Sequence, residues 1–301
     1  MALTADPLYG RGTHHLVDAQ KALEDQLEWR LREVLKSPSY RPPVLPRVAM
    51  ELVAATAKVD TSAKKVIELL TSDPLLATQV LRMAQSAIYG SVPIRSLDDA
   101  VRRLGTRRLA DLAMETALTS RVFRGGPYSE AADDVARHAR LTGHMARLVC
   151  KNTALPAENA FLKGLLHDVG AILVMFAIAD MRIEKPPIER AWRAINALHA
   201  EAGALACRAW KLPEEIALLV EHHHSVTVDG KTHPMRCAIM LADAIADERE
   251  GPPRIGSPGL QRQAHRDVLA ARAELSITPD KWKTLLLEAT ALATELSAPS
   301  R

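Results

Sequence analysis

An apolar run from Phe161 to Phe176 limits the possible folds of this chain more than any other feature. Apolar side chains occupy almost every side of the helix that it predicts, so we expect the helix to be buried. His167 and Asp168 nevertheless stand side by side in its middle. Burying a neutral polar group without a partner costs roughly 2–7 kcal/mol, and a charge costs more. These two side chains therefore need partners in the core, and a metal ion is a good one.

Composition is ordinary for a soluble globular protein, with 48% hydrophobic and 25% charged residues among 301. The formal net charge is only +3, so we do not expect nucleic-acid binding; a basic cluster at residues 102–108 is interpreted as a solvated helix face. We expect no membrane association, because the sequence lacks an uninterrupted apolar span. Three widely spaced cysteines favour a reducing compartment, and we predict a cytoplasmic protein.

Helical periodicity throughout the chain predicts an all-α fold, a two-lobed helical bundle. The first lobe consists of short helices, two of which should begin at Asp73-Pro74 and at Ser96. Longer helices make up the second lobe, and one of them should run from Pro156 to about Ala179. The predicted units are an N-terminal extension with one amphipathic helix at 14–36 (residues 1–41), the short-helix lobe (42–123), the long-helix lobe (127–250) and C-terminal helices near 260–275 and 279–297 (251–301).

Histidines and aspartates on several of the longer helices could converge on a metal, as ligands do in helical bundles. The candidates are His138, His167, Asp168, His199, His223, His224 and Asp243. Neighbouring helical residues diverge by about 100°, so His167 and Asp168 could share one ion or serve two. By the same geometry, at most two histidines of the triplet at 222–224 should face the site.

The ligand types bear on the identity of the metal. Nitrogen and carboxylate oxygen without thiolate suit Fe, Mn, Zn or Ni better than copper(I) or an iron–sulfur cluster. Such an ion lowers the pKa of bound water and polarises a phosphoryl oxygen, so phosphoester hydrolysis is the natural chemistry. Two interpretations without a metal stay open. Each residue alone could be a surface or core side chain, and the histidines together could simply hydrogen-bond in a purely structural domain.

Several segments resemble the HDOD domain family across roughly residues 42–245. They are Asp73–Gly90, Ser96–Ala100, Leu104–Gly105, Leu162–Gly170, Trp210–Pro213 and the histidine triplet. Gln85 stands where family members usually have asparagine. The resemblance implies an all-helical bacterial signalling or regulatory protein, whose second half is related to the HD superfamily of metal-dependent phosphohydrolases.

Carried onto this sequence, the H…HD…D pattern of that superfamily falls on His138, His167, Asp168 and Asp243, and the remaining candidate histidines resemble additional ones in the HD-GYP phosphodiesterases of cyclic di-GMP. Two departures weaken a catalytic role. Ala171 replaces a lysine of those enzymes, and residues 225–230 lack their Gly-Tyr-Pro segment. The resemblance therefore favours a metal-bound sensor or scaffold that binds a signalling protein or a nucleotide second messenger. A metal-dependent phosphohydrolase acting on a nucleotide or cyclic dinucleotide is the alternative.

Overall fold

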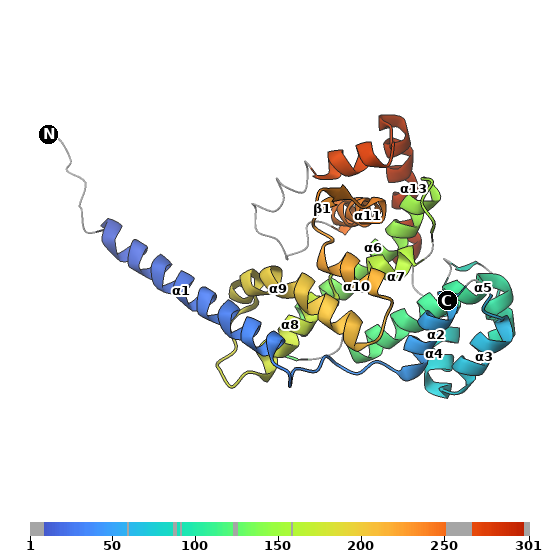
Figure 1. Cartoon of the computed structure of the whole chain (residues 1–301), viewed down its shortest axis with the longest axis horizontal. Helices are drawn as coiled ribbons and strands as arrows, with labels where there is room; N and C mark the ends of the chain where they lie inside the picture. The colour runs from blue at the N-terminus through green and yellow to red at the C-terminus, as the bar shows by residue number, and fades with distance from the viewer. Residues whose placement is uncertain are drawn as a thin grey trace.

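The computed structural model describes residues 9–58, 60–86, 89–90, 92–122, 126–157, 159–250 and 267–297, and their fold is all-α. A long helix projects from the body at one end, and the short helices gather at the other (Figure 1). The labelled helices are α1 (Tyr9–Lys36), α2 (Arg47–Thr56), α3 (Ala63–Thr71), α4 (Pro74–Ala84), α5 (Leu97–Arg121), α6 (Ser129–Lys151), α7 (Ala160–Leu166), α8 (Val169–Asp180), α9 (Ile188–Ala209), α10 (Glu214–Glu221), α11 (Pro234–Glu250) and α13 (Pro279–Ser297).

Helix starts in the short-helix region follow the capping residues of the sequence. The side chains of Asp73 and Ser96 each accept a backbone N–H three residues further on, at 3.0 Å, and Pro74 occupies the first helical position. Both predicted starts are thereby confirmed. Gly105 interrupts α5 with a φ of 79°, a conformation that only glycine adopts without strain. Helix α5 is therefore kinked at this glycine.

The apolar run does not form the single helix that its composition predicts. It breaks at His167 and Asp168 into α7 and α8, and Asp168 leaves helical geometry with φ −108° and ψ 11°. The break accompanies a very close approach of α8 to α9, where Gly170 touches the backbone of the facing helix. By length and composition the span Ala160–Asp180 could cross a bilayer, but 89% of its most apolar window is buried inside the protein. It is a core segment.

A two-stranded hairpin, which the sequence interpretation did not include, follows the histidine triplet. Strands β1 (Thr227–Val228) and β2 (Lys231–Thr232) pair antiparallel through a turn at Asp229 and Gly230. Both turn residues have positive φ, of 51° and 72°, as an Asp-Gly hairpin turn requires. The Asp-Gly pair was thus a usable signal.

Helix α6 is central to the packing and contacts α7, α11 and α13, while α8 lies on α9 and α9 on α10 and α1. One hydrophobic cluster runs from Leu27 to Val220, and a second joins α6, α11 and α13. Residues 267–274 and α13 give the two predicted C-terminal helices, although the start predicted near 260 and the linker at 251–259 lie outside the described residues. Residues 124 and 125, between the two predicted lobes, lie outside the described residues as well. The two-lobed arrangement and the unit limits stay predictions.

Candidate metal centre

Three histidines are oriented by the same local hydrogen bond. In each, ring nitrogen Nδ1 lies within hydrogen-bond distance of the backbone carbonyl three residues earlier. The pairs are His167 with Gly164 at 2.7 Å, His199 with Asn196 at 2.8 Å, and His223 with Val220 at 2.6 Å. Because a carbonyl only accepts, Nδ1 must carry the proton, and Nε2 of the neutral ring keeps a lone pair. This is the arrangement of metal-ligating histidines, whose second nitrogen donates to a carbonyl or carboxylate.

The three Nε2 atoms converge on the carboxylate of Asp168. Its Oδ1 lies 3.2 Å from Nε2 of His223 and 3.4 Å from Nε2 of His199, and its Oδ2 lies 3.3 Å from Nε2 of His167. His224 completes this side, with its Nε2 2.8 Å from that of His199. The interruption of the helix at Asp168 thus points one carboxylate at histidines from three separate segments.

A second group adjoins the first on the α6 and α11 side. His138, on α6, places Nε2 2.9 Å from Oδ1 of Asp243 on α11, and the same oxygen lies 3.5 Å from Nε2 of His167. Candidate ligand atoms of His138, His167 and Asp168 all lie within 4.8 Å of one another. Asp168 therefore belongs to both groups. All seven residues chosen from the sequence meet in this His/Asp cluster, and His222 lies outside it.

The chemistry of the cluster fits a cation. Nε2 of His167 and Oδ1 of Asp168 are buried without a hydrogen-bond partner among the described residues. An unsatisfied buried polar atom costs about 1–3 kcal/mol, and more if charged. An imidazole nitrogen and a carboxylate oxygen in that position are atoms that a divalent ion could take as ligands, so the cluster is able to hold a metal.

The charges in this cluster shift the pKa values of its members. Burial by itself would lower the pKa of His167, but the carboxylates of Asp168 and Asp243 hold it well above its usual value. Burial also opposes ionisation of Asp168, and the neighbouring imidazoles, His167 first, nonetheless keep its pKa well below the ordinary range. In the metal-free protein, positive charge on His167 therefore compensates the carboxylates. A bound cation would take over that role and release protons.

Asp247 is the one member that the sequence interpretation missed. Its Oδ1 lies 3.6 Å from Nδ1 of His138, and it groups with His138 and Asp243 as a possible third ligand set. Burial and the nearby Asp243 carboxylate raise its pKa to about 7. Its spacing of four residues from Asp243, one turn along the same face of α11, was the available signal.

Close helix packing holds the cluster together. A Cβ on Gly170 would lie 1.8 Å from the carbonyl oxygen of His199, and one on Gly203 would lie 2.7 Å from Val220. These two glycines let α8 and α9 approach at the level of His199. The backbone spacing therefore brings the Asp168 turn within reach of the histidine on the facing helix.

Comparison with known proteins agrees with this architecture. The sequence profile of the HDOD domain matches residues 43–226. An uncharacterized protein of Treponema pallidum (strain Nichols) is 28% identical over 202 residues, which are 61% of this chain and 38% of that protein. The chain therefore spans well under half the length of this curated relative.

Two solved structures share the fold at 22% identity. One is an HDOD domain protein of unknown function from Geobacter sulfurreducens, with a TM-score of 0.63 over 89% of this chain and 98% of the other. The second, from Shewanella amazonensis SB2B, is described as a candidate metal-dependent phosphohydrolase and has a TM-score of 0.69 over 90% and 98%. A profile that spans more than half of the chain, together with this fold and the His/Asp cluster, shows that the protein belongs to the HDOD domain family.

Proposed function

We propose that this protein is a bacterial-type signalling module whose His/Asp cluster binds one or two divalent transition-metal ions, of Fe, Mn, Zn or Ni, and which acts by recognising a signalling protein or a nucleotide second messenger. The observation that carries the proposal is the convergence of the Nε2 atoms of His167, His199 and His223 on Asp168. Their shared Nδ1–H to carbonyl bonds hold each ring in the ligating orientation before any ion arrives.

A regulatory role is favoured over catalysis by what surrounds the cluster. Ala171, 1% exposed, is buried where related phosphodiesterases have lysine. In the described part of the chain, no lysine or arginine forms an ion pair with Asp168 or Asp243, and the ionic partners of both carboxylates there are histidines. A phosphate at the site would therefore lack the protein cation that positions it and stabilises its developing charge.

The three cysteines support a cytoplasmic location, which we also propose. Cys150, Cys207 and Cys237 are all buried and free. Burial raises the pKa of the Cys207 thiol to about 12, so it stays protonated and unreactive. Such side chains suit a compartment in which thiols remain reduced.

Elemental analysis of protein purified without chelators or a metal-binding tag tests the metal site. We expect about one to two equivalents of a transition metal per chain, lost in Asp168→Ala and in the closer isostere Asp168→Asn. His222→Ala is the matched control, because it removes a histidine of the same triplet from outside the cluster, and it should retain the metal. Metal-free wild-type protein, or metal retained in both Asp168 variants, would contradict the proposal.

A metal-dependent phosphohydrolase is the second candidate function, favoured by the position of Asp168 in both ligand groups. When bound, the metal would supply an activated water and a Lewis acid for phosphoester cleavage. The Asp168 side chain is 15% exposed and His224 is exposed, so the cluster has a solvent-facing side. Turnover of phosphomonoesters or phosphodiesters by the metal-loaded protein, abolished in folded Asp168→Asn, would establish the enzyme. No turnover alongside a specific complex with a partner would establish the signalling module.

A further inference from the structure

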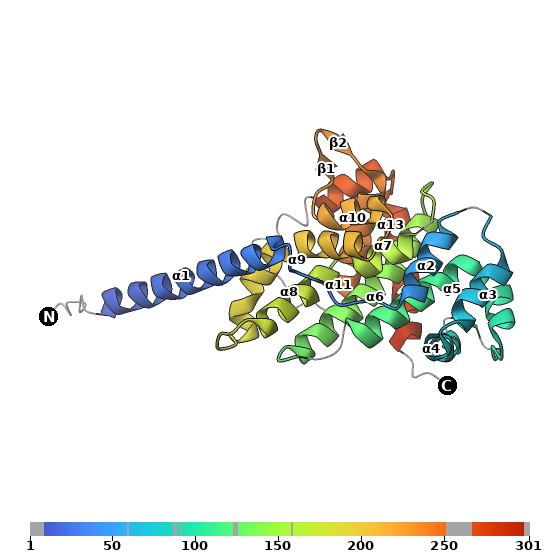
Figure 2. The same ribbon diagram turned by 60° about the horizontal axis from the view of Figure 1, so that its bottom comes forward.

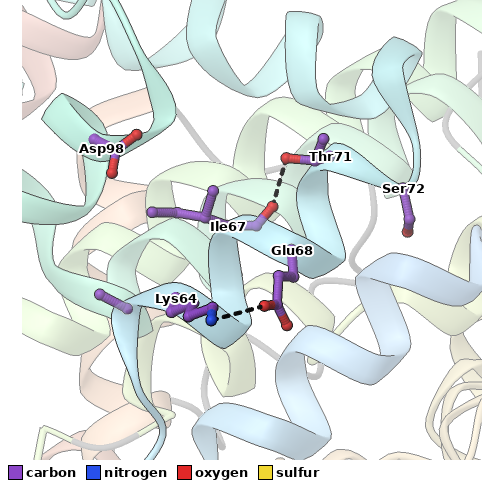
Figure 3. A pocket seen from close by; sticks show the side chains of 7 residues that line it. Lys64, Ile67, Glu68, Thr71, Ser72 and Asp98 are labelled. Carbon is purple, nitrogen blue, oxygen red and sulfur yellow. Dashed lines mark hydrogen bonds and ion pairs between the residues drawn. The ribbon is translucent and has the colours of Figure 1, made fainter.

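Two surface hollows differ sharply in what lines them. The one beside α3, of about 600 Å³, is lined mostly by exposed side chains that satisfy one another (Figure 3). Lys64 pairs with Glu68 at 4.0 Å, and the Thr71 hydroxyl donates to the Ile67 carbonyl at 2.7 Å. A second hollow, of about 540 Å³, lies between α5, α6 and α13 and is lined by basic side chains. We call this second one the α5–α6–α13 hollow.

Positive charge predominates in the α5–α6–α13 hollow. Among the described residues that line it, four are basic and two, Asp111 and Glu295, are acidic. The four are Arg107, Arg108, Arg147 and Lys151. Arg147 neutralises Asp111 at 2.7 Å, and Arg107 donates to the Thr56 carbonyl at 2.9 Å.

The other two basic residues are still available. Arg108 and Lys151 are exposed and form no ion pair within the described part of the chain. The described lining also contains one carboxylate that forms no ion pair there, that of Glu295 on α13. The hollow therefore carries excess positive charge that the fold itself does not use.

His144 supplies an independent indication of a ligand. It lines the hollow, it is only 3% exposed, and its Nε2 is buried with no hydrogen-bond partner among the described residues. The ring packs edge-on against Phe161, with centroids 4.9 Å apart. Burial, and then the charges of Arg147, Arg140 and Arg108, lower its pKa well below the usual value, so the ring is neutral. Leaving a buried polar atom unsatisfied is costly, and such an atom calls for an explanation.

We propose that the α5–α6–α13 hollow binds a phosphate-bearing small molecule. Arg108 and Lys151 would neutralise the phosphate, while His144, which is buried and lines the same hollow, offers a polar atom that has no partner among the described residues. Phosphate oxygens accept charge-assisted hydrogen bonds from arginine and lysine, which are stronger than those between neutral groups. The volume of about 540 Å³ falls within the range of about 300–1,000 Å³ that is usual for small-molecule sites.

This site is separate from the His/Asp cluster and goes beyond the proposed function. His138 and His144 lie on the same helix α6, six residues apart. At about 100° and 1.5 Å per residue, they point about 120° apart around the helix and lie about 9 Å apart along its axis. One helix thus serves the metal cluster with one face and the hollow with another.

The test is a calorimetric titration of the full chain with inorganic pyrophosphate. Metal-free protein is used, both chelator-dialysed wild type and Asp168→Asn, so that a metal cannot capture the probe. We expect saturable binding, weakened on the order of tenfold or more by Arg108→Ala together with Lys151→Ala, because two of the charge-assisted contacts are lost. The matched control is Arg102→Ala with Arg137→Ala, which removes the same charge from the same two helices at exposed positions outside the hollow.

His144 is tested by two substitutions whose folding is checked by thermal unfolding. His144→Gln keeps a side-chain N–H, whereas His144→Phe fills the space without a polar group. We expect the Gln variant to bind pyrophosphate more tightly than the Phe variant. The proposal is overturned if metal-free protein shows no saturable binding, or if the Arg108 and Lys151 double variant binds like its matched control.

Discussion

At the scale of single residues, the cluster shows how a histidine that is unremarkable in the sequence becomes a ligand candidate. Nδ1 of His167, of His199 and of His223 is turned to a carbonyl one helical turn back. That bond is local, so any histidine in or just after a helix could form it. What selects these three is the carboxylate of Asp168 at the other nitrogen, and that contact depends on the tertiary fold.

Residue types and spacing therefore predicted the candidates but not their geometry. The pairing of His138 with Asp243 joins positions 105 apart in the sequence. No periodicity encodes such a contact, because it depends on how α6 and α11 pack. Asp247 was missed because one more aspartate on a helix that also faces solvent looks like a surface charge. The unsatisfied Nε2 of His144 was equally out of reach, since burial of a single atom is a property of packing.

The first prediction at this scale concerns Glu115 and the dependence of stability on pH. It is 2% exposed on α5 beside Asp111, with Arg140 of α6 at 2.8 Å and Arg147 also near. Burial outweighs those two cations and raises the pKa of Glu115 from 4.5 to about 7. Glu115 of the folded protein therefore holds a proton at pH 5–7 that it has released in the unfolded chain, so its contribution to stability falls as pH rises through this window.

Replacing Glu115 by Gln should remove this pH-dependent contribution to stability. A folded-state pKa of about 7, against 4.5 unfolded, corresponds to a loss on the order of 3 kcal/mol between pH 4 and pH 8. We expect the free energy of unfolding of Glu115→Gln, relative to wild type, to rise across that interval. Urea unfolding of metal-free protein at several pH values measures the difference, from which the other titrating groups cancel. A difference that does not change with pH would show that Arg140 keeps Glu115 ionised.

At the scale of elements, the instructive case is the apolar run around the His-Asp pair. Its composition predicted a buried helix, and burial is confirmed, since Val169 and the residues from Ala171 to Met175 are at most 3% exposed. The break at His167 and Asp168 could not be predicted from apolarity, because both helical and broken forms bury the same side chains. It becomes understandable only with α9 in place, where Gly170 meets the His199 backbone. The hairpin differs in this respect, because its Asp-Gly turn is encoded locally.

Gly170→Ala gives the prediction at this scale. The added methyl would lie 1.8 Å from the His199 carbonyl oxygen and 2.5 Å from the Gly203 nitrogen, both backbone atoms that cannot rotate away. Overpacking of this kind costs roughly 1–3 kcal/mol and occasionally more, which exceeds the gain of up to about 1 kcal/mol in helix propensity. We expect the free energy of unfolding, measured by chemical denaturation, to fall by an amount at the upper end of that range. Metal retention should also weaken, because α9 carries His199.

Gly203→Ala is the matched comparison from the same interface. Its methyl would meet Cγ1 of Val220 at 2.7 Å, the tip of a side chain, and the nearest backbone atom is the Gly170 nitrogen at 3.3 Å. A side chain can shift where a carbonyl cannot, so this variant should be the less destabilised of the two. Equal losses in both would mean that α8 and α9 are free to separate, and that their spacing does not position the cluster.

At the scale of the whole molecule, the question is what holds the projecting helix α1 to the rest of the chain. The sequence predicted an amphipathic helix that could pack on the core or on a partner. Its C-terminal part lies along α9, with contacts to α8, while its N-terminal part extends away from the body (Figure 2). Leu27, Leu31 and Leu35 are buried at 8%, 0% and 3% exposure. Arg32 of α1 also pairs with Glu201 of α9 at 3.1 Å.

The apolar contacts should dominate this attachment. The Arg32 to Glu201 pair is more than a third exposed on both sides, and such pairs contribute about 0–1 kcal/mol. Truncating a fully buried leucine typically costs roughly 2–5 kcal/mol. Because Leu31 belongs to the cluster that reaches Val220, α1 should unfold together with the helices that carry the metal cluster, and not as a separate appendage.

Leu31→Ala should therefore lower the free energy of unfolding of the whole chain by roughly 2–5 kcal/mol, in one transition. Leu23→Ala, on the same helix but 61% exposed, should change it by less than about 0.5 kcal/mol. Urea unfolding followed by far-ultraviolet circular dichroism and by tryptophan fluorescence measures both variants. Both are measured in a Trp29→Phe background, because Trp29 lies on α1 itself and is 63% exposed. The fluorescence of Trp192 and Trp210, on and after α9, then reports the core, whereas circular dichroism also includes α1. Coincident transitions shifted equally in Leu31→Ala are expected, and an early loss of helix with an unshifted fluorescence transition would show that α1 folds on its own.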